Sequence, residues 1–179
     1  MKKFIVLFTV LVFVSGCTKE KTAPQVVSNY LNEFQLLTKN ISDEIESSLN
    51  NEKEYNAEHK KIYKEILTRQ YKDLKYDIFK EEYDDDKALI YVNVNVYDLK
   101  KAEDDAVLYL SDHLSEFYNK NNVFDNDKYL SYKLNLMLNT SNRIDYEIIF
   151  YLEKKSSKWI LLQPTDNDLE KIHGIYTSE

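Results

Sequence analysis

The chain has 179 residues and a formal net charge of −7, because acidic residues outnumber basic ones. Such an excess of acid lacks the positive surface that nucleic-acid binding requires, so we expect no nucleic-acid partner. Its two glycines are too few for a phosphate-cradling loop or a dinucleotide-binding motif, and the sequence contains no GxSxG motif of a serine hydrolase.

The first residues have the layout of a secretory signal peptide. Two lysines give a positive start, Phe4 to Val14 form an uninterrupted apolar run, and small residues follow. A helix over this run would be roughly 17 Å long, against about 30 Å for the hydrocarbon core of a bilayer. We therefore expect residues 1–16 to be a signal peptide, cleaved between Gly16 and Cys17, rather than a transmembrane anchor.

Cys17 is the only cysteine of the chain, and it follows the apolar run directly. The stretch Val14-Ser15-Gly16-Cys17 resembles the lipobox of bacterial lipoproteins, in which a diacylglycerol is attached to the cysteine sulfur before the preceding peptide is removed. The resemblance implies acyl chains such as palmitate on Cys17, and two or three chains anchor a protein stably to a membrane. A buried cysteine that packs as a small hydrophobe is the alternative.

The lipobox predicts a protein held on the extracytoplasmic face of the cell membrane, with the membrane as a partner through the lipid anchor. Residues 17–23 are then the lipidated cysteine and a polar tether, which reaches about 20 Å at most. Residues 24–179 have the length of a single domain.

Helical spacing dominates the start of this domain. Thr22-Ala23-Pro24-Gln25 has the pattern of a capping box with proline near the first helical position. Apolar residues then recur at helical spacing from Val27 to Leu49, which predicts one helix that Asn50-Asn51 ends. A second helix is predicted from Tyr55 to Leu67.

A period of two follows, which is typical of strands. Leu74 to Ile78 and Ala88 to Val96 alternate between apolar and polar residues, and an acidic turn at residues 84–87 separates them. The pattern predicts an antiparallel hairpin. A second hairpin is predicted from a strand at Ile144 to Leu152, a turn at residues 154–157 and a return strand at residues 158–162. Trp159 of this return strand is expected in the core or at its edge.

Between and after these hairpins the pattern is helical again. Residues 102–117 have helical spacing, and residues 119–127 form a polar loop. The segment from Tyr129 to Leu138 alternates like a strand, but it is rich in leucine and has no β-branched residue, which favours a helix. Residues 169–173 are predicted to add a helical turn after Pro164, closed by Gly174.

The order of these elements resembles the NTF2-like, or cystatin-like, α+β fold, and more closely the small NTF2-like lipoproteins of Gram-positive bacteria. The matching stretches are residues 87–92 with Asp98, and residues 153–155 with 158–160; Ser156-Ser157 replaces the usual glycine of the last turn. The resemblance implies amino-terminal helices packed on a curved antiparallel sheet and an accessory or binding domain that faces the cell envelope. It implies no catalytic residue.

Side chains able to bind metal are present, but their spacing in the sequence gives little support to a metal site. His113 and Glu116 could share a helix face, whereas His59 and His173 lie on other elements, and a catalytic zinc needs three protein ligands. The carboxylates of residues 81–86, 125–127 and 166–170 lack the glycine and terminal glutamate of a calcium-binding loop. We interpret them as caps and turns, and expect no metal and no cofactor besides the acyl chains.

Three functions remain open. The first, which we favour, is a lipid-anchored binding or accessory domain that engages a protein, peptide or wall component. The second is an immunity or exclusion lipoprotein that intercepts a toxin or phage component. The third is a small-molecule enzyme or carrier, which we disfavour because the inward rows Ala88 to Val96 and Ile144 to Leu152 are not expected to place a carboxylate or histidine in the cavity.

The best candidate for a binding site is a row on the outward side of the second strand, formed by Tyr91, Asn93, Asn95 and Tyr97, with Tyr151 beside it. Tyrosine gives large contact area with few rotatable bonds, and asparagine offers both donors and acceptors, so the mixture suits a protein or glycan surface. The alternative is a solvated sheet face that is simply rich in strand-forming residues.

Overall fold

A computed structural model describes residues 20–177, which form an α+β structure, and the predicted fold class is correct at this level. Gly16 and Cys17 lie outside the described residues. The elements, in order, are α1 (Ala23–Gln35), α2 (Lys39–Asn51), α3 (Ala57–Lys72), β1 (Lys75–Asp84), β2 (Lys87–Tyr97), α4 (Leu99–Asp112), the 3-10 helix η1 (Leu114–Phe117), α5 (Asn126–Asn139), β3 (Arg143–Lys155), β4 (Lys158–Leu161) and α6 (Asp166–His173).

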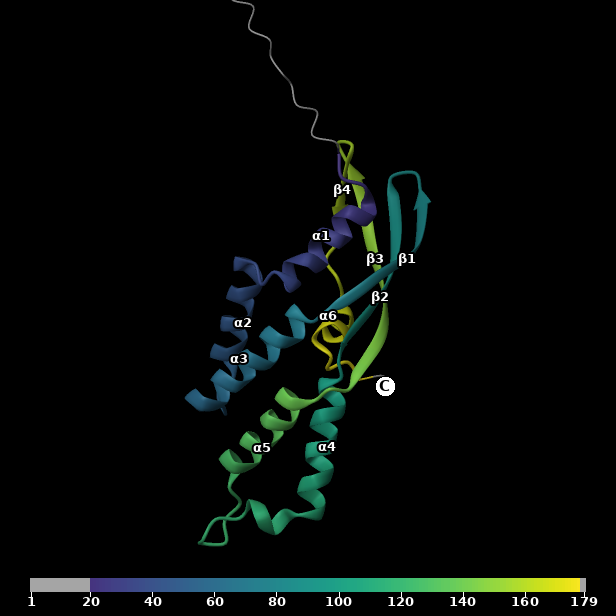
Figure 1. Cartoon of the computed structure of the whole chain (residues 1–179). Coiled ribbons are helices and arrows are strands. Elements are labelled where there is room, and N and C mark those ends of the chain that lie inside the picture. The colour runs from purple at the N-terminus through teal and green to yellow at the C-terminus, as the bar shows by residue number, and fades with distance from the viewer. Residues whose placement is uncertain (1–19, 178–179) are drawn as a thin grey trace, which may run out of the picture.

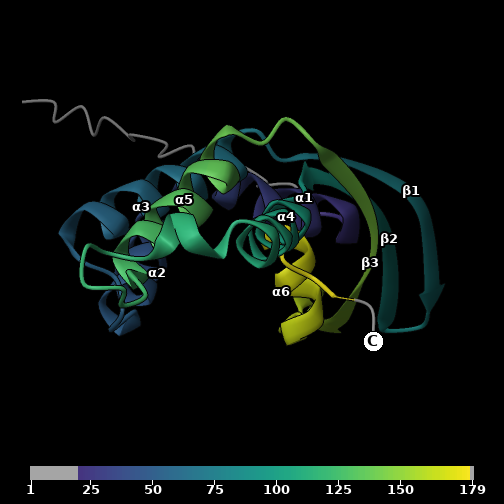
Figure 2. The ribbon, with the colours of Figure 1, turned by 90° about the horizontal axis from the view of Figure 1, so that it is seen from below.

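The four strands form one antiparallel sheet in the order β1-β2-β3-β4, and both predicted hairpins are confirmed. The neighbouring strands β2 and β3 are joined by α4, η1 and α5, which project from one end of the sheet (Figure 1). Viewed from below, all the helices lie on the same side of the sheet (Figure 2). We call that side of the sheet its inner face and the opposite side its outer face.

The alternation in β2 separates the two faces as predicted. Val92, Val94 and Val96 are completely buried on the inner face, where they join the core that also contains Leu31 of α1 and Phe150 of β3. A central strand made of valine and isoleucine fits such a half-buried surface because β-branched side chains pack well on the pleat. The core therefore lies between the inner face and the helices.

The prediction of one helix from residue 23 to 49 is wrong. The capping box at Thr22 starts α1 as expected, but α1 ends at Gln35 and α2 begins at Lys39. Leu37, between them, has a φ of 48°, which no helix accommodates. The break allows α1 to contact β2 and β4 while α2 contacts α3, and one straight helix could not do both.

The segment from Tyr129 to Leu138 belongs to α5, so the helix prediction is confirmed. Leu134 and Met137 of α5 form a second apolar cluster with Ile66 of α3 and Leu99 of α4. The predicted helix over residues 102–117 is shorter than expected, because α4 ends at Asp112 and η1 follows.

The last hairpin turns at Ser156 and Ser157, whose φ values are 50° and 68°. A two-residue turn with both φ positive matches the twist of paired strands and usually contains glycine, so these serines adopt a conformation that glycine adopts more easily. After the hairpin, α6 ends at Gly174 in the left-handed conformation, as predicted.

Within residues 20–177, no helix is both long enough and apolar enough to cross a membrane.

Candidate binding surface

The outer face of the sheet is not covered by any helix of the part that the structure describes (Figure 2). The register of β1 with β2 and of β2 with β3 places Tyr91, Asn93 and Asn95 of the predicted row on this face. Tyr97, at the end of β2, packs instead against the apolar cluster of α3, α4 and α5. Asn93 is exposed, whereas the other three side chains are partly buried. The contacts of each side chain divide the row into two halves.

One half belongs to a continuous apolar patch. Leu89 pairs with Tyr151 and Tyr91 pairs with Ile149 across β2 and β3, so their side chains are neighbours on the outer face. Phe79 of β1 packs against Tyr91, with 6.1 Å between ring centroids. We define the outer patch as Phe79, Leu89, Tyr91, Ile149, Tyr151 and Ile160. Its rim members Phe79, Tyr151 and Ile160 are 46%, 54% and 43% exposed.

Phe79 reaches the patch because of a bulge in β1. The pairing with β2 shifts between Ile78 and Lys80, so that Ile78 faces Val92 and Lys80 faces Tyr91 with Phe79 inserted between them. An inserted residue interrupts the alternation of side chains between the two faces of the sheet. The period of two therefore does not predict that Phe79 is part of the site. Ile149 could have been found, since it alternates with buried residues in β3.

Tyr91 is held in place by two charged neighbours from β1. Its hydroxyl donates to Glu82 over 3.1 Å, and the ammonium of Lys80 lies 4.5 Å from its ring centroid. Desolvation and the bond to Glu82 raise the pKa of Tyr91, and the bond from Lys80 lowers the pKa of Glu82. Tyr91 is therefore neutral near pH 7 and presents an oriented ring at the outer face.

The other half of the row is engaged within the molecule. The guanidinium groups of Arg69 and Arg143 both lie over the Tyr97 ring, and the hydroxyl of Tyr97 donates to Asp73 over 2.8 Å. Arg143 also donates to the side-chain oxygen and the carbonyl oxygen of Asn95. These contacts fasten β2 to α3 and to the start of β3, so Tyr97 and Asn95 contribute to the fold and offer little free surface to a partner.

The three histidines are not brought together. His59 is 1% exposed between α3 and α5, where its Nε2 lies 2.9 Å from the Ser131 hydroxyl. His113 stacks on the ring of Tyr109 with 4.0 Å between centroids. His173 lies 2.9 Å from the Tyr71 hydroxyl, and burial lowers its pKa to about 4.

The described residues contain no group of three or more His, Cys, Asp or Glu side chains that could hold a metal ion.

Buried polar side chains serve the architecture. Gln70 is 1% exposed, and its side-chain amide accepts from the Tyr97 backbone N–H and donates to the Tyr97 and Ile172 carbonyls. Its amide thereby joins α3, β2 and α6 through the core. No carboxylate is among the fully buried polar residues of the described chain, which are His59 and Gln70.

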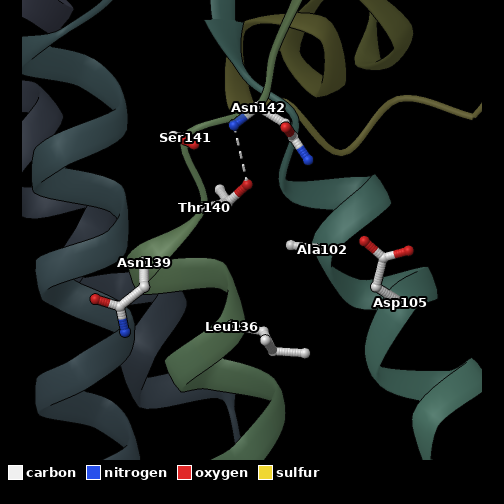
Figure 3. A pocket seen from close by; sticks show the side chains of 7 residues that line it. All are labelled: Ala102, Asp105, Leu136, Asn139, Thr140, Ser141 and Asn142. Atoms are coloured by element: carbon white, nitrogen blue, oxygen red, sulfur yellow. Dashed lines mark hydrogen bonds between the residues drawn. The ribbon is translucent and has the colours of Figure 1, made fainter.

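A polar cleft of about 270 Å³ lies between α4 and α5 (Figure 3). It is lined by Ala102 and Asp105 of α4, Leu136 and Asn139 of α5, and the loop of Thr140, Ser141 and Asn142. The Asp105 carboxylate is bound by Lys101, and the Thr140 hydroxyl accepts from the Asn142 backbone N–H. The cleft thus lacks a pair of free titratable groups, and the outer patch remains the stronger candidate.

Comparisons of the chain with protein-family models, with curated proteins and with solved structures found no match.

Proposed function

We propose that the protein is a lipid-anchored binding domain of the bacterial cell envelope, held on the extracytoplasmic face of the membrane through Cys17. The sequence Val14-Ser15-Gly16-Cys17 supports the anchor. We also propose that the domain is NTF2-like, since amino-terminal helices precede an antiparallel sheet and lie on one face of it. Its role is binding rather than catalysis.

The observation that carries the binding role is the outer patch. It joins aromatic and aliphatic side chains from all four strands, with Ile160 contributed by β4. The charged residues Lys80 and Glu82 of β1 contact Tyr91 from the edge strand of the sheet. An apolar centre rich in tyrosine and phenylalanine with a charged rim is the composition of a protein-binding surface.

The position of the patch supports one kind of partner. Helix α1 begins beside the tip of the β3–β4 hairpin, at the same end of the sheet as the β1–β2 turn (Figure 1). Leu89 and Tyr151 lie close to these turns in the sequence, so the patch is at the end where the tether joins the domain. A tether of about 20 Å would keep that end near the membrane. This position supports a proposal that the partner is the extracytoplasmic part of a membrane protein.

Site-specific photocross-linking in intact cells tests this function. A benzophenone amino acid at position 151 should form an adduct with a membrane protein, and the same group at Glu65, which is exposed on α3, should not. Adding Phe79→Ala and Tyr91→Ala should remove the adduct. Equal adducts from both positions, or none from position 151, would contradict the proposal.

A further inference from the structure

A second cleft, separate from the outer patch, lies where α1, α2, the end of β4 and the start of α6 meet. Its volume is about 440 Å³, the larger of the two clefts described here. We call it the α1–α2 cleft; it is lined by Tyr30, Glu33, Phe34, Asn40, Ile41, Glu44, Leu161, Leu162, Gln163, Pro164 and Leu169. It exists because the chain turns at Leu37, which separates α1 from α2.

The floor of the cleft is aromatic and rigid. Tyr30 packs edge-to-face against Phe34 and Phe150, with centroid distances of 5.4 and 5.9 Å. Phe34 is 2% exposed and also packs against Tyr71. The Tyr30 ring is therefore held by its contacts with the core, and it also lines the cleft. Such a preformed aromatic surface can receive an apolar stem or a cation.

The walls of the cleft are negative. Glu33 and Glu44 line it, and none of the lining residues is lysine, arginine or histidine, although the chain has 24 lysines and arginines. Neither glutamate takes part in the ion pairs found among residues 20–177. Burial, and to a smaller extent the nearby Glu44, Glu33 and Asp168, raise the pKa of the Tyr30 phenol to about 12.

We propose that the α1–α2 cleft binds a lysine or arginine side chain presented by an extended peptide segment of a partner. The aliphatic stem of such a side chain matches the apolar lining of Tyr30, Leu161 and Pro164. Its cationic head matches Glu33 and Glu44. The matching charge is what favours a basic peptide over a neutral or acidic one. This site does not depend on the outer patch, and it can bind whether or not the outer patch has a partner.

The test is a binding measurement with the full-length chain in a non-ionic detergent. The probe is an acetylated, amidated peptide in which lysines alternate with leucines, and titration calorimetry at low salt gives its affinity. Glu33→Gln with Glu44→Gln should weaken binding about five- to tenfold, since each removes one charge contact. Glu58→Gln with Glu65→Gln, two exposed glutamates of α3, should leave the affinity unchanged.

Two further probes define the ligand. A peptide with norleucine in place of lysine should lose most of the affinity, because it keeps the stem and lacks the cation. Free butylamine should bind at least about tenfold more weakly than the peptide, because it lacks the flanking peptide contacts.

The proposal is overturned if the lysine peptide does not bind, if both double variants lose the same affinity, or if butylamine binds as well as the peptide. If the first double variant unfolds, Glu44→Gln alone is used, because it changes an exposed side chain. This single variant should weaken binding about two- to threefold, as expected for the loss of one charge contact.

Discussion

The guanidinium carbon of Arg69 lies 3.7 Å from the centroid of the Tyr97 ring, and Arg143 lies 4.5 Å from the same centroid. These are the only arginines of the chain, so both of them contact one tyrosine. Arg69 also donates to the carbonyls of Leu138 and Thr140 at the end of α5. Tyr97 therefore lies where α3, α5, β2 and β3 meet.

Replacing Tyr97 with alanine should lower the free energy of unfolding by about 2–3 kcal/mol, because the ring and both cation–π contacts are lost together. Tyr97→Phe keeps the ring and loses the bond to Asp73, so it should cost about 1 kcal/mol. Urea denaturation measures both values. Tyr91→Ala is the matched control on the same strand, and an equal loss in that variant would show that Tyr97 has no special structural role.

Replacing Gly174 with alanine should destabilise the protein by about 3 kcal/mol. The φ of this residue is 73°, and an added Cβ would collide with the carbonyl oxygen of Tyr97 and the side chain of Gln70. Thermal unfolding followed by circular dichroism gives the change. Alanine at Asp112, near the end of α4, is a control that should have little effect.

His173 should make the stability depend on pH below neutrality. Its pKa is about 4 in the folded protein against an ordinary value of 6.5, so the unfolded chain takes up the proton first as the pH falls. The stabilisation is complete above pH 6.5 and is lost between pH 6.5 and 4, by about 3 kcal/mol in all.

Urea denaturation from pH 7.5 to 4.5 checks the effect of His173. His173→Gln keeps a partner for the Tyr71 hydroxyl and removes the titration, so its free energy of unfolding should fall less steeply than that of the wild type over this range. Carboxylates titrate equally in both proteins. Identical pH profiles would mean that His173 keeps an ordinary pKa.

Replacing Cys17 with alanine should abolish fatty-acid labelling and move the protein from the detergent phase to the aqueous phase, because two or three acyl chains supply the attachment to the membrane. Metabolic labelling and detergent phase separation measure these two effects. Ser15→Ala, which keeps a small residue before the cleavage site, should be labelled normally. Undiminished labelling without Cys17 would contradict the lipid anchor.

Trp159 is partly buried at the edge of the core, where its ring lies 5.8 Å from that of Tyr83 and 5.6 Å from the Lys154 ammonium. Trp159→Ala should therefore cost about 2 kcal/mol, less than the 3–5 kcal/mol of a fully buried tryptophan. Urea denaturation followed by circular dichroism measures it. Ile160→Ala, at an exposed neighbour, should cost well under about 1 kcal/mol.

The sequence predicted the features that depend on a local period. Alternation identified the inner face of β2, and leucine-rich composition identified α5, because burial and propensity act over a few residues. The break at Leu37 and the bulge at Phe79 interrupt such periods without a glycine or proline to mark them. Both are set by packing with distant elements, which a local pattern does not contain.

The candidate site shows the same limit. Alternation places Tyr91, Asn93 and Asn95 on one face of β2, as the structure does, but it does not indicate that Tyr97 packs against the helices and against Arg69, which is far away in the sequence. The α1–α2 cleft could not be predicted at all, since it requires the turn that the helical spacing had concealed.

The insertion of α4 and α5 between β2 and β3 also constrains the order of folding. The hairpins β1–β2 and β3–β4 close through short turns, whereas β2 and β3 pair over eleven positions from Lys87–Glu153 to Tyr97–Arg143 across the whole insertion. Closing a long loop costs entropy before its contacts form. We therefore expect two hairpins that appear early and a slow step in which the centre of the sheet is assembled, with α4 and α5 already packed on each other when β2 meets β3.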